Sequence, residues 1–419
     1  MRKVMKRFMV VLMITGLLIS AVVYGAAKEP KVTLTVFAGQ STTDAGLEDI
    51  VQKAVAARYP NITLQWEAVD WGKDFHPKMQ QYIQSGLPDI IIGKAQDIAV
   101  YGSQGLLASL NGKSYLQRVL PAAIPGVTVK GKTYGIVYNC LYQGVYYNRK
   151  IFTENGLKIP GTQTELVEAI NKLKAKGITP FATHMVDSWS IGNITMQFAI
   201  NEVFNKAPNW GEQFRAGKES FAKSAAYKKC YEYNKLIYDN TWSKETFSLG
   251  QTDCDARMVQ GKAAMKVSGS WSIQNFMNVD KNFDFGVFPF PNQSGDAKLI
   301  FEPNMTWMKS AKTKHSAEVD KVFDVITGDV KAAVEFYNQT KTASMLKGVS
   351  PTFPNPSQKD IDKYAAAGKI IDANRGNNQL QWGGFQEENA KDIAAWLQGT
   401  ISLNDALKAA DNRKANSKP

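Results

Sequence analysis

The chain has 419 residues, of which 44% are hydrophobic and 21% are charged, an ordinary globular composition that excludes disordered, collagen-like and coiled-coil classes. Its length predicts two or three domains. Three cysteines and three widely spaced histidines exclude a disulfide scaffold and a four-cysteine zinc site, and argue against a histidine-based catalytic metal. We therefore expect neither a metal nor another cofactor.

The net charge of +12 at pH 7 does not come from one region. The basic residues are scattered over several predicted helices, a turn and the C-terminal tail, with no run of five or more like charges. Such scattering is typical of solvated helix faces, so we expect no nucleic-acid partner.

The N-terminal segment has the pattern of an export signal. Four basic residues precede an apolar run over residues 8–23, which is shorter than the ~20 residues that a membrane-spanning helix needs. Small residues follow, and cleavage after Gly25 or after Ala27 fits a signal peptide over residues 1–27; an uncleaved membrane anchor is the alternative. No cysteine lies near the cleavage point, so we expect a periplasmic or extracellular protein without a lipid anchor.

An oxidising compartment permits disulfides. Cys230 and Cys254 can then close a modest loop, which would leave Cys140 as a buried thiol. The sequence leaves open whether this pair forms.

The first part of the mature chain alternates strands with helices. We predict strands over residues 31–37, 62–67 and 89–93, with helices over 47–59 and 77–84 between them. The third strand is a short apolar β-branched run, as expected for a strand buried on both faces. This order predicts an α/β fold with right-handed crossovers.

The alternation resumes further along the chain. The predicted strands are 133–138, 144–147, 180–181, 263–267 and 283–288, and the predicted helices are 163–176, 223–239, 255–260, 317–326, 330–340, 385–397 and 403–410. Residues 139–144 and the proline- and glycine-rich stretch 348–356 are the predicted connections between domains.

Several stretches, taken in order, resemble one protein family. These are residues 88–107, 131–136 with 146–150, 261–265 with 269–271, 285–291 and 400–410, which are similar to segments of maltose-binding protein. Each motif is weak alone, but their shared order from residue 31 to residue 410 is specific. The chain therefore resembles the extracellular solute-binding proteins (family 1) of carbohydrate ABC importers.

This resemblance implies an α/β, two-lobe periplasmic-binding-protein fold, type II-like, with hinged lobes joined by crossover strands. Lobe one would comprise residues 28–139 and 306–349, and lobe two residues 140–305 and 350–419. The implied function is extracytoplasmic binding of a sugar or oligosaccharide, which the closed lobes deliver to the membrane subunits of an ABC importer. We expect a monomer that is not an enzyme. Because a fold does not by itself give a function, the site must support this reading.

A sugar site needs planar polar side chains for the hydroxyl groups and aromatic rings for the apolar C–H face. Trp271 follows a Gly-Ser pair in a predicted loop, and the resemblance implies a carboxylate and an aromatic at the spacing of Asp187 and Trp189. The tail would supply either Trp382 or Phe385. The alternatives are tryptophans in the core and Asp187 as a helix N-cap.

Lobe one should contribute polar side chains at the carboxyl ends of its strands, where α/β sheets bind ligands. Lys94, Gln96 and Asp97 follow the buried strand over residues 89–93. The remaining candidates are Gln40 after the first strand, Asn139 at the position of a hinge acid, and Asn304 before Trp307.

The chain departs from maltose-binding protein in lobe one. Gly93 stands where that protein has an aromatic residue, and Gln96 where it has an acid. Trp66 and Trp71 are the candidates for the missing ring. We therefore leave the particular sugar open.

Three other functions remain open. A secreted carbohydrate-active enzyme needs two carboxylates about 5–10 Å apart, and Asp97, Asp187 and Glu302 are available. A ferric-ion binder needs converging tyrosines, but Tyr146 and Tyr147 are strand neighbours that face opposite sides. An adhesin or sensor partner could share the same lobes.

Overall fold

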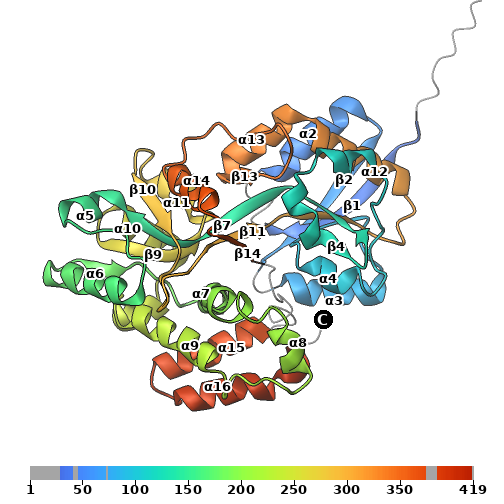
Figure 1. Ribbon diagram of the computed structural model, residues 1–419. Coiled ribbons are helices and arrows are strands. Elements are labelled where there is room, and N and C mark those ends of the chain that lie inside the picture. Colours follow the sequence, from blue (N-terminus) through green and yellow to red (C-terminus); the bar gives the residue numbers. More distant parts are fainter. Residues whose placement is uncertain (1–28, 41–45, 72–73, 374–384, 418–419) are drawn as a thin grey trace, which may run out of the picture.

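The structure is a computed structural model that describes residues 29–40, 46–71, 74–373 and 385–417. These residues form two lobes, each with a β-sheet covered by helices, and strand β7 (Asn139–Asn148) runs from one lobe into the other (Figure 1). The predicted two-lobe α/β fold is thereby confirmed. The expected signal peptide and the candidate Trp382 lie outside the described residues. Within those residues, no helix is both long enough and apolar enough to cross a membrane.

Lobe one is built on a five-stranded sheet in the order β2-β1-β3-β12-β6. Strands β1, β2 and β3 are parallel, whereas β12 is antiparallel to both of its neighbours. The elements of this lobe are β1 (Val32–Gly39), α2 (Leu47–Arg58), β2 (Ile62–Val69), α3 (Phe75–Ser85), β3 (Ile90–Gly93), α4 (Asp97–Tyr101), η1 (Ser114–Arg118), η2 (Pro121–Ala123), η3 (Pro125–Val127), β4 (Thr128–Val129), β5 (Lys132–Thr133), β6 (Gly135–Val137), β12 (Thr306–Lys309), α12 (Ser316–Gly328) and α13 (Val330–Thr340).

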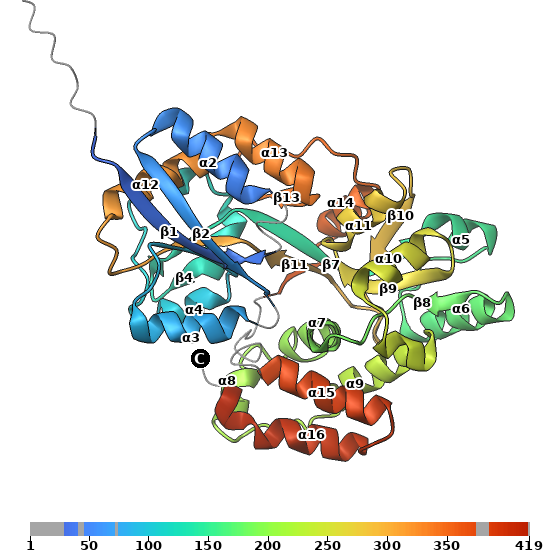
Figure 2. The same ribbon diagram turned by 180° about the vertical axis from the view of Figure 1, so that it is seen from behind.

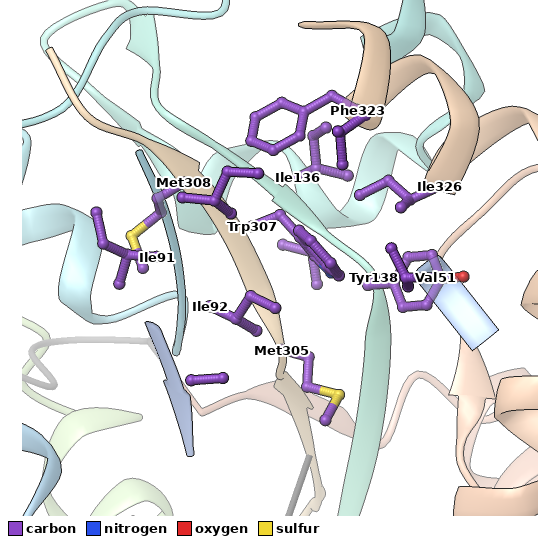
Figure 3. Close-up of a cluster of buried hydrophobic side chains, with 14 of the residues drawn as sticks. Val51, Ile91, Ile92, Ile136, Tyr138, Met305, Trp307, Met308, Phe323 and Ile326 are labelled. Carbon is purple, nitrogen blue, oxygen red and sulfur yellow. The ribbon is translucent and has the colours of Figure 1, made fainter. Parts of the chain in front are cut away.

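The core of lobe one is centred on β3 and β12. All four residues of β3 are buried, as its apolar sequence predicts. The Trp307 indole of β12 is fully buried and meets Tyr138 and Phe323 edge-on (Figure 3). Trp66 also packs edge-on against Trp307, so this candidate for the lobe-one sugar ring belongs to the core.

Lobe two is built on a seven-stranded sheet in which β7 is central, with β11 and β10 on one side and β9 on the other. Helices α7, α9, α15 and α16 pack against one another below this sheet (Figure 2). Its further elements are α5 (Arg149–Glu154), α6 (Gln163–Ala175), β8 (Thr179–Phe181), α7 (Ser188–Ala199), η4 (Ile200–Phe204), α8 (Trp210–Arg215), α9 (Ala225–Tyr238), η5 (Ser243–Phe247), α10 (Gln251–Val259), β9 (Ala263–Gly269), α11 (Ser272–Val279), β10 (Phe285–Phe288), β11 (Leu299–Pro303), β13 (Ala343–Ser344), α14 (Gln358–Ala366), β14 (Ile370–Asp372), α15 (Phe385–Leu397), α16 (Leu403–Asn412) and η7 (Lys414–Ser417).

The segments that pass between the lobes are hydrogen-bonded to one another. The backbone N–H of Asn304 donates to the carbonyl of Asn139 at 2.9 Å, and the Asn139 amide donates to Thr342 Oγ1 at 3.1 Å. Strand β13 pairs with the start of β7. The core residues of lobe one all lie before Leu141 or between Met305 and Val349. We therefore propose that lobe one comprises residues 28–139 and 306–349, and lobe two residues 140–305 and 350–419.

Most of the predicted elements are present within a few residues of their expected ends. Several observed elements were not predicted, among them the strands β11, β12 and β14 and the helices α7, α11 and α14. The sequence of α7 contains β-branched residues and a glycine, which are weak helix formers. Nine of its twelve residues are buried, so tertiary packing outweighs this weak propensity. Trp189 therefore lies in the first turn of a helix that the sequence did not indicate.

The three cysteines are all free and buried. The sequence left open whether Cys230 and Cys254 pair, and in the structure they do not. Cys230 lies on α9 within the apolar core of lobe two, where a thiol packs as a small hydrophobic group. Burial raises the pKa of the Cys140 thiol to about 12.

Candidate functional site

A cleft of about 1400 Å³ lies between the two lobes. In lobe one, it is bordered by the residues that follow the carboxyl ends of β2 and β3, and by α13 with the two residues after it. In lobe two, it is bordered by residues at the ends of β9, β11 and β14, together with α7, α10, α11 and the start of α15. Both sheets thus direct the edge that binds ligands in α/β proteins toward the same space.

Seven of the predicted site residues line this cleft. They are Lys94, Gln96, Asp97, Asn139, Trp189, Trp271 and Asn304. They come from both lobes and from the crossing segments, so the structure brings together residues up to 210 positions apart in the sequence.

Three other predicted residues are described but lie outside the cleft lining. Gln40 and Asp187 are exposed, and Asp187 precedes α7 without a side-chain cap bond to it. Phe385 is buried in the core of lobe two against Phe214 and Phe221, which corrects its assignment to the site. The reason is that its ring points into the apolar helical layer, while the next two residues of α15 face the cleft.

The indole of Trp71 lines the cleft on lobe one and lies directly over a glycine. It stacks on Phe75, with 4.6 Å between ring centroids. A Cβ atom added to Gly39, at the end of β1, would fall 1.9 Å from Trp71 Cε2. The absence of a side chain at position 39 is therefore what allows this indole to lie flat against the strand.

Lobe two repeats this arrangement. A Cβ atom added to Gly269, at the end of β9, would fall 2.0 Å from Trp271 Cζ3. Trp271 also meets Trp189 edge-on, with 6.4 Å between ring centroids. Each lobe thus presents at least one indole to the cleft, held in place by its contact with a glycine.

A buried histidine lies behind the lobe-two tryptophans. His184 is 3% exposed, and its ring centroid is 5.2 Å from that of Trp189. Neither ring nitrogen has a hydrogen-bond partner among the described residues. Burial, together with the nearby Lys266 ammonium, lowers the pKa of His184 from 6.5 to about 3. The imidazole therefore stays neutral and acts as packing for Trp189.

An ion pair joins the lobes beside the crossing segments. The Lys94 ammonium of lobe one lies 3.7 Å from the Glu302 carboxylate of lobe two. Glu302 also accepts a hydrogen bond from the buried Gln143 amide.

A second carboxyl group lies on the lobe-two side of the cleft. Burial raises the pKa of this group, Glu387, above its ordinary value.

Asp97 has a local structural role. Its side chain is 1% exposed and accepts a hydrogen bond from the backbone N–H of Lys94 at 2.6 Å. His76 Nε2 lies 3.5 Å from the other carboxylate oxygen. Asp97 therefore holds the loop that carries Lys94 and Gln96, and this differs from the free ligand-binding carboxylate that we expected.

Carboxamides from α10 and α11 form much of the lobe-two wall, and sequence reasoning missed them. Gln251, Gln274, Asn275 and Asn278 all line the cleft. The spacing of residues 274, 275 and 278, directly after Trp271, would have placed them on one helical face. That signal was not used because α11 itself was not predicted.

Several polar atoms of cleft residues are buried without a hydrogen-bond partner in the described structure. They are Asn139 Oδ1, Trp271 Nε1 and Gln274 Oε1. The set includes both donors and acceptors, which suits a ligand whose groups can do both. No group of three or more metal-ligating side chains occurs within the described ranges.

Two hinged α/β lobes around a polar and aromatic cleft define the class of a two-lobed binding protein. Residues 38–337 match the model of the family described as bacterial extracellular solute-binding protein, so the chain belongs to that family.

Known proteins support this assignment. The multiple sugar-binding protein of Streptococcus mutans is 26% identical over 339 residues, which cover 79% of each chain. Among solved structures, a chitin oligosaccharide binding protein has a TM-score of 0.77 at 21% identity and covers 92% of this chain and 99% of its own. RafE in complex with raffinose has a TM-score of 0.76 at 19% identity and covers 93% and 100%. The two structures establish the similarity of fold.

The lowered pKa of the buried His184 predicts how the stability of the protein depends on pH. The unfolded chain takes up a proton on His184 near pH 6.5, whereas the folded protein does so only near pH 3. Stability should therefore fall as the pH drops through this interval, by up to about 1.4 kcal/mol per pH unit from this group. Urea unfolding between pH 4 and pH 7 should show that His184→Leu loses less stability than the wild type. Parallel pH profiles of the two proteins would contradict a neutral buried imidazole.

Proposed function

We propose that this protein binds a sugar or oligosaccharide in the cleft between its lobes and delivers it to an ABC importer. The observation that carries the proposal is the lining of the cleft, which combines indoles seated on glycines with carboxamides from both lobes. Membership of the extracellular solute-binding family and the similarity to the multiple sugar-binding protein of Streptococcus mutans support it.

The chemistry of the cleft fits a neutral, hydroxyl-rich ligand. A hydroxyl group donates one hydrogen bond and accepts others, so it can satisfy both the Trp271 N–H and the Gln274 oxygen. The C–H face of a sugar ring can rest on the flat indoles of Trp71 and Trp271. The cleft volume of about 1400 Å³ exceeds that of a usual small-molecule pocket of 300–1,000 Å³, which favours an oligosaccharide.

The proposed contacts come from both lobes. In lobe one they are Trp71, Lys94 and Gln96, in lobe two Trp189 and Trp271, and at the crossings Asn139 and Asn304. A ligand that touches both walls binds the closed arrangement more tightly than the open one, so it shifts the population toward closure. The closed form would then be the one that the importer's membrane subunits recognise.

The remaining parts of the proposal concern the state of the protein in the cell. We propose export by cleavage of the segment over residues 1–27 without a lipid anchor, which agrees with the extracellular nature of the family. We also propose that the protein is a monomer, binds no nucleic acid and makes or breaks no bond in the sugar. Analysis of oligosaccharides after incubation with the protein tests the last point, and any hydrolysis product would contradict it.

Calorimetric titration with raffinose, stachyose and diacetylchitobiose tests the proposed function. At least one of these sugars should bind with a dissociation constant near or below the micromolar range, which corresponds to about 8 kcal/mol. Trp271→Ala should weaken that binding at least tenfold because a ring face and a buried N–H donor are lost.

The matched control is Trp242→Ala, since Trp242 is a partly buried indole of the same lobe that is not among the cleft-lining residues. It should leave the affinity within twofold of the wild type. Absence of binding to every oligosaccharide in a broader panel would contradict the proposed function, and an unchanged affinity of Trp271→Ala would remove this residue from the site.

A substitution at Gly39 tests whether the position of the Trp71 indole matters for binding, because the variant keeps the indole itself. Gly39→Ala keeps Trp71 but places a methyl group where its ring now lies, so the indole must tilt away from the strand. We expect a fivefold or greater loss of affinity for the sugar that the wild type binds. Gly161→Ala is the control, because the nearest atom to its added Cβ is 3.4 Å away. Equal affinities of both variants would show that the seating is unimportant.

A further inference from the structure

A buried carboxylate lies directly behind the carboxamide wall of lobe two. Asp255 of α10 is fully buried and forms an ion pair with Lys266 of β9, which is 1% exposed. The second carboxylate oxygen, Oδ2, accepts a hydrogen bond from the Asn275 amide nitrogen at 2.8 Å and a longer one from the Gln251 amide nitrogen at 3.4 Å. Asp255 does not line the cleft itself, but Asn275 and Gln251 do.

The negative charge of Asp255 determines which end of the Asn275 and Gln251 amides faces it. An ionised carboxylate only accepts hydrogen bonds, whereas a carboxamide donates through its nitrogen and accepts through its oxygen. The end of each amide that faces Asp255 must therefore be the NH₂ group. The amide oxygens of Asn275 and Gln251 are then directed away from the ion pair.

We infer that Asp255 is a positioning residue that turns Asn275 and Gln251 so that the lobe-two wall offers acceptor oxygens to the cleft. This inference rests on the proposed function and deepens it, because it states which ligand groups that wall selects. The complementary groups are donors, such as sugar hydroxyl O–H or acetamido N–H groups. A ligand that presents only acceptors, such as a carboxylate or a phosphate, would face the acceptor oxygens of this wall and could not hydrogen-bond to them.

Lys266 keeps this arrangement fixed. Its ammonium is the cation that compensates Asp255, and a buried carboxylate without such a partner would be costly. The pair is thus placed to hold the amides before a ligand arrives, which lowers the ordering cost of binding.

The arrangement can be tested first without any sugar. The side-chain amide signal of Asn275 can be assigned in a ¹⁵N spectrum by its loss in Asn275→Ala. If one of its protons is donated to a buried carboxylate, that proton should exchange with solvent at least tenfold more slowly than the other. Equally fast exchange of both protons in the wild type would overturn the inference, whichever sugar the protein binds.

The effect on binding is tested with a double-mutant cycle. Asp255→Asn alone would leave the Lys266 charge buried and unpaired, so the informative variant is Asp255→Asn/Lys266→Met, which removes both charges at similar volume. It should bind the sugar chosen by the wild type about tenfold more weakly, because Asn275 is no longer held in one orientation. In the Gln251→Ala/Asn275→Ala background, which removes both positioned amides, the same pair of substitutions should change the affinity less than twofold.

A matched control neutralises a different ion pair. Lys309→Met/Asp320→Asn removes the pair between β12 and α12 of lobe one, in which Asp320 also contacts the solvent-accessible Lys113. This pair lies away from the cleft lining, so the variant should leave sugar affinity within twofold. If Asp255→Asn/Lys266→Met weakens binding by the same factor with and without Gln251→Ala/Asn275→Ala, or if it binds like the wild type, the positioning role is wrong. The proposed function would stand in either case, because it depends only on binding by the wild type.

Discussion

The apolar residues of this chain pack into separate cores in the two lobes, and hydrogen-bonded crossing segments join those lobes. The first core is organised around β3 and β12, and the second around β7 and the helices α7, α9 and α15. Each sheet directs strand ends toward the space between the lobes. The cleft is therefore a consequence of how the two cores are built, and its polar residues lie at strand ends and on the helices that border the same space.

The walls of the cleft are held by contacts that lie behind them. Gly39 and Gly269 let two indoles lie flat against strand ends, and Asp97 fixes the loop after β3. Behind the lobe-two wall, the buried Asp255 contacts two carboxamides. Such support reduces the freedom that side chains lose when a ligand binds, so more of the contact energy remains available for affinity.

The order β1, α2, β2, α3 and β3 of lobe one was predictable because these strands are apolar and the helices between them have clear ends, whereas strand β12 was not predicted. The motif order also identified the family and placed Trp271, Lys94 and Gln96 at the cleft. These predictions depended on local patterns, in which residues close in sequence determine the result.

The parts that could not be predicted depend on tertiary contacts. Helix α7, which carries Trp189, forms through burial despite weak local propensity, so the sequence did not predict it. The choice between Trp382 and Phe385 required the direction in which α15 begins, and the structure places Phe385 in the core. The structural role of Asp97 required its contact with the Lys94 backbone, which no spacing rule gives.

A crystal structure with a bound oligosaccharide, selected by titration of the wild type, tests the central claim most directly. The account predicts that sugar rings lie against Trp71 and Trp271 and that amides from both lobes contact their hydroxyl groups. A sugar bound outside this cleft, or one that touches a single lobe of a closed protein, would contradict it.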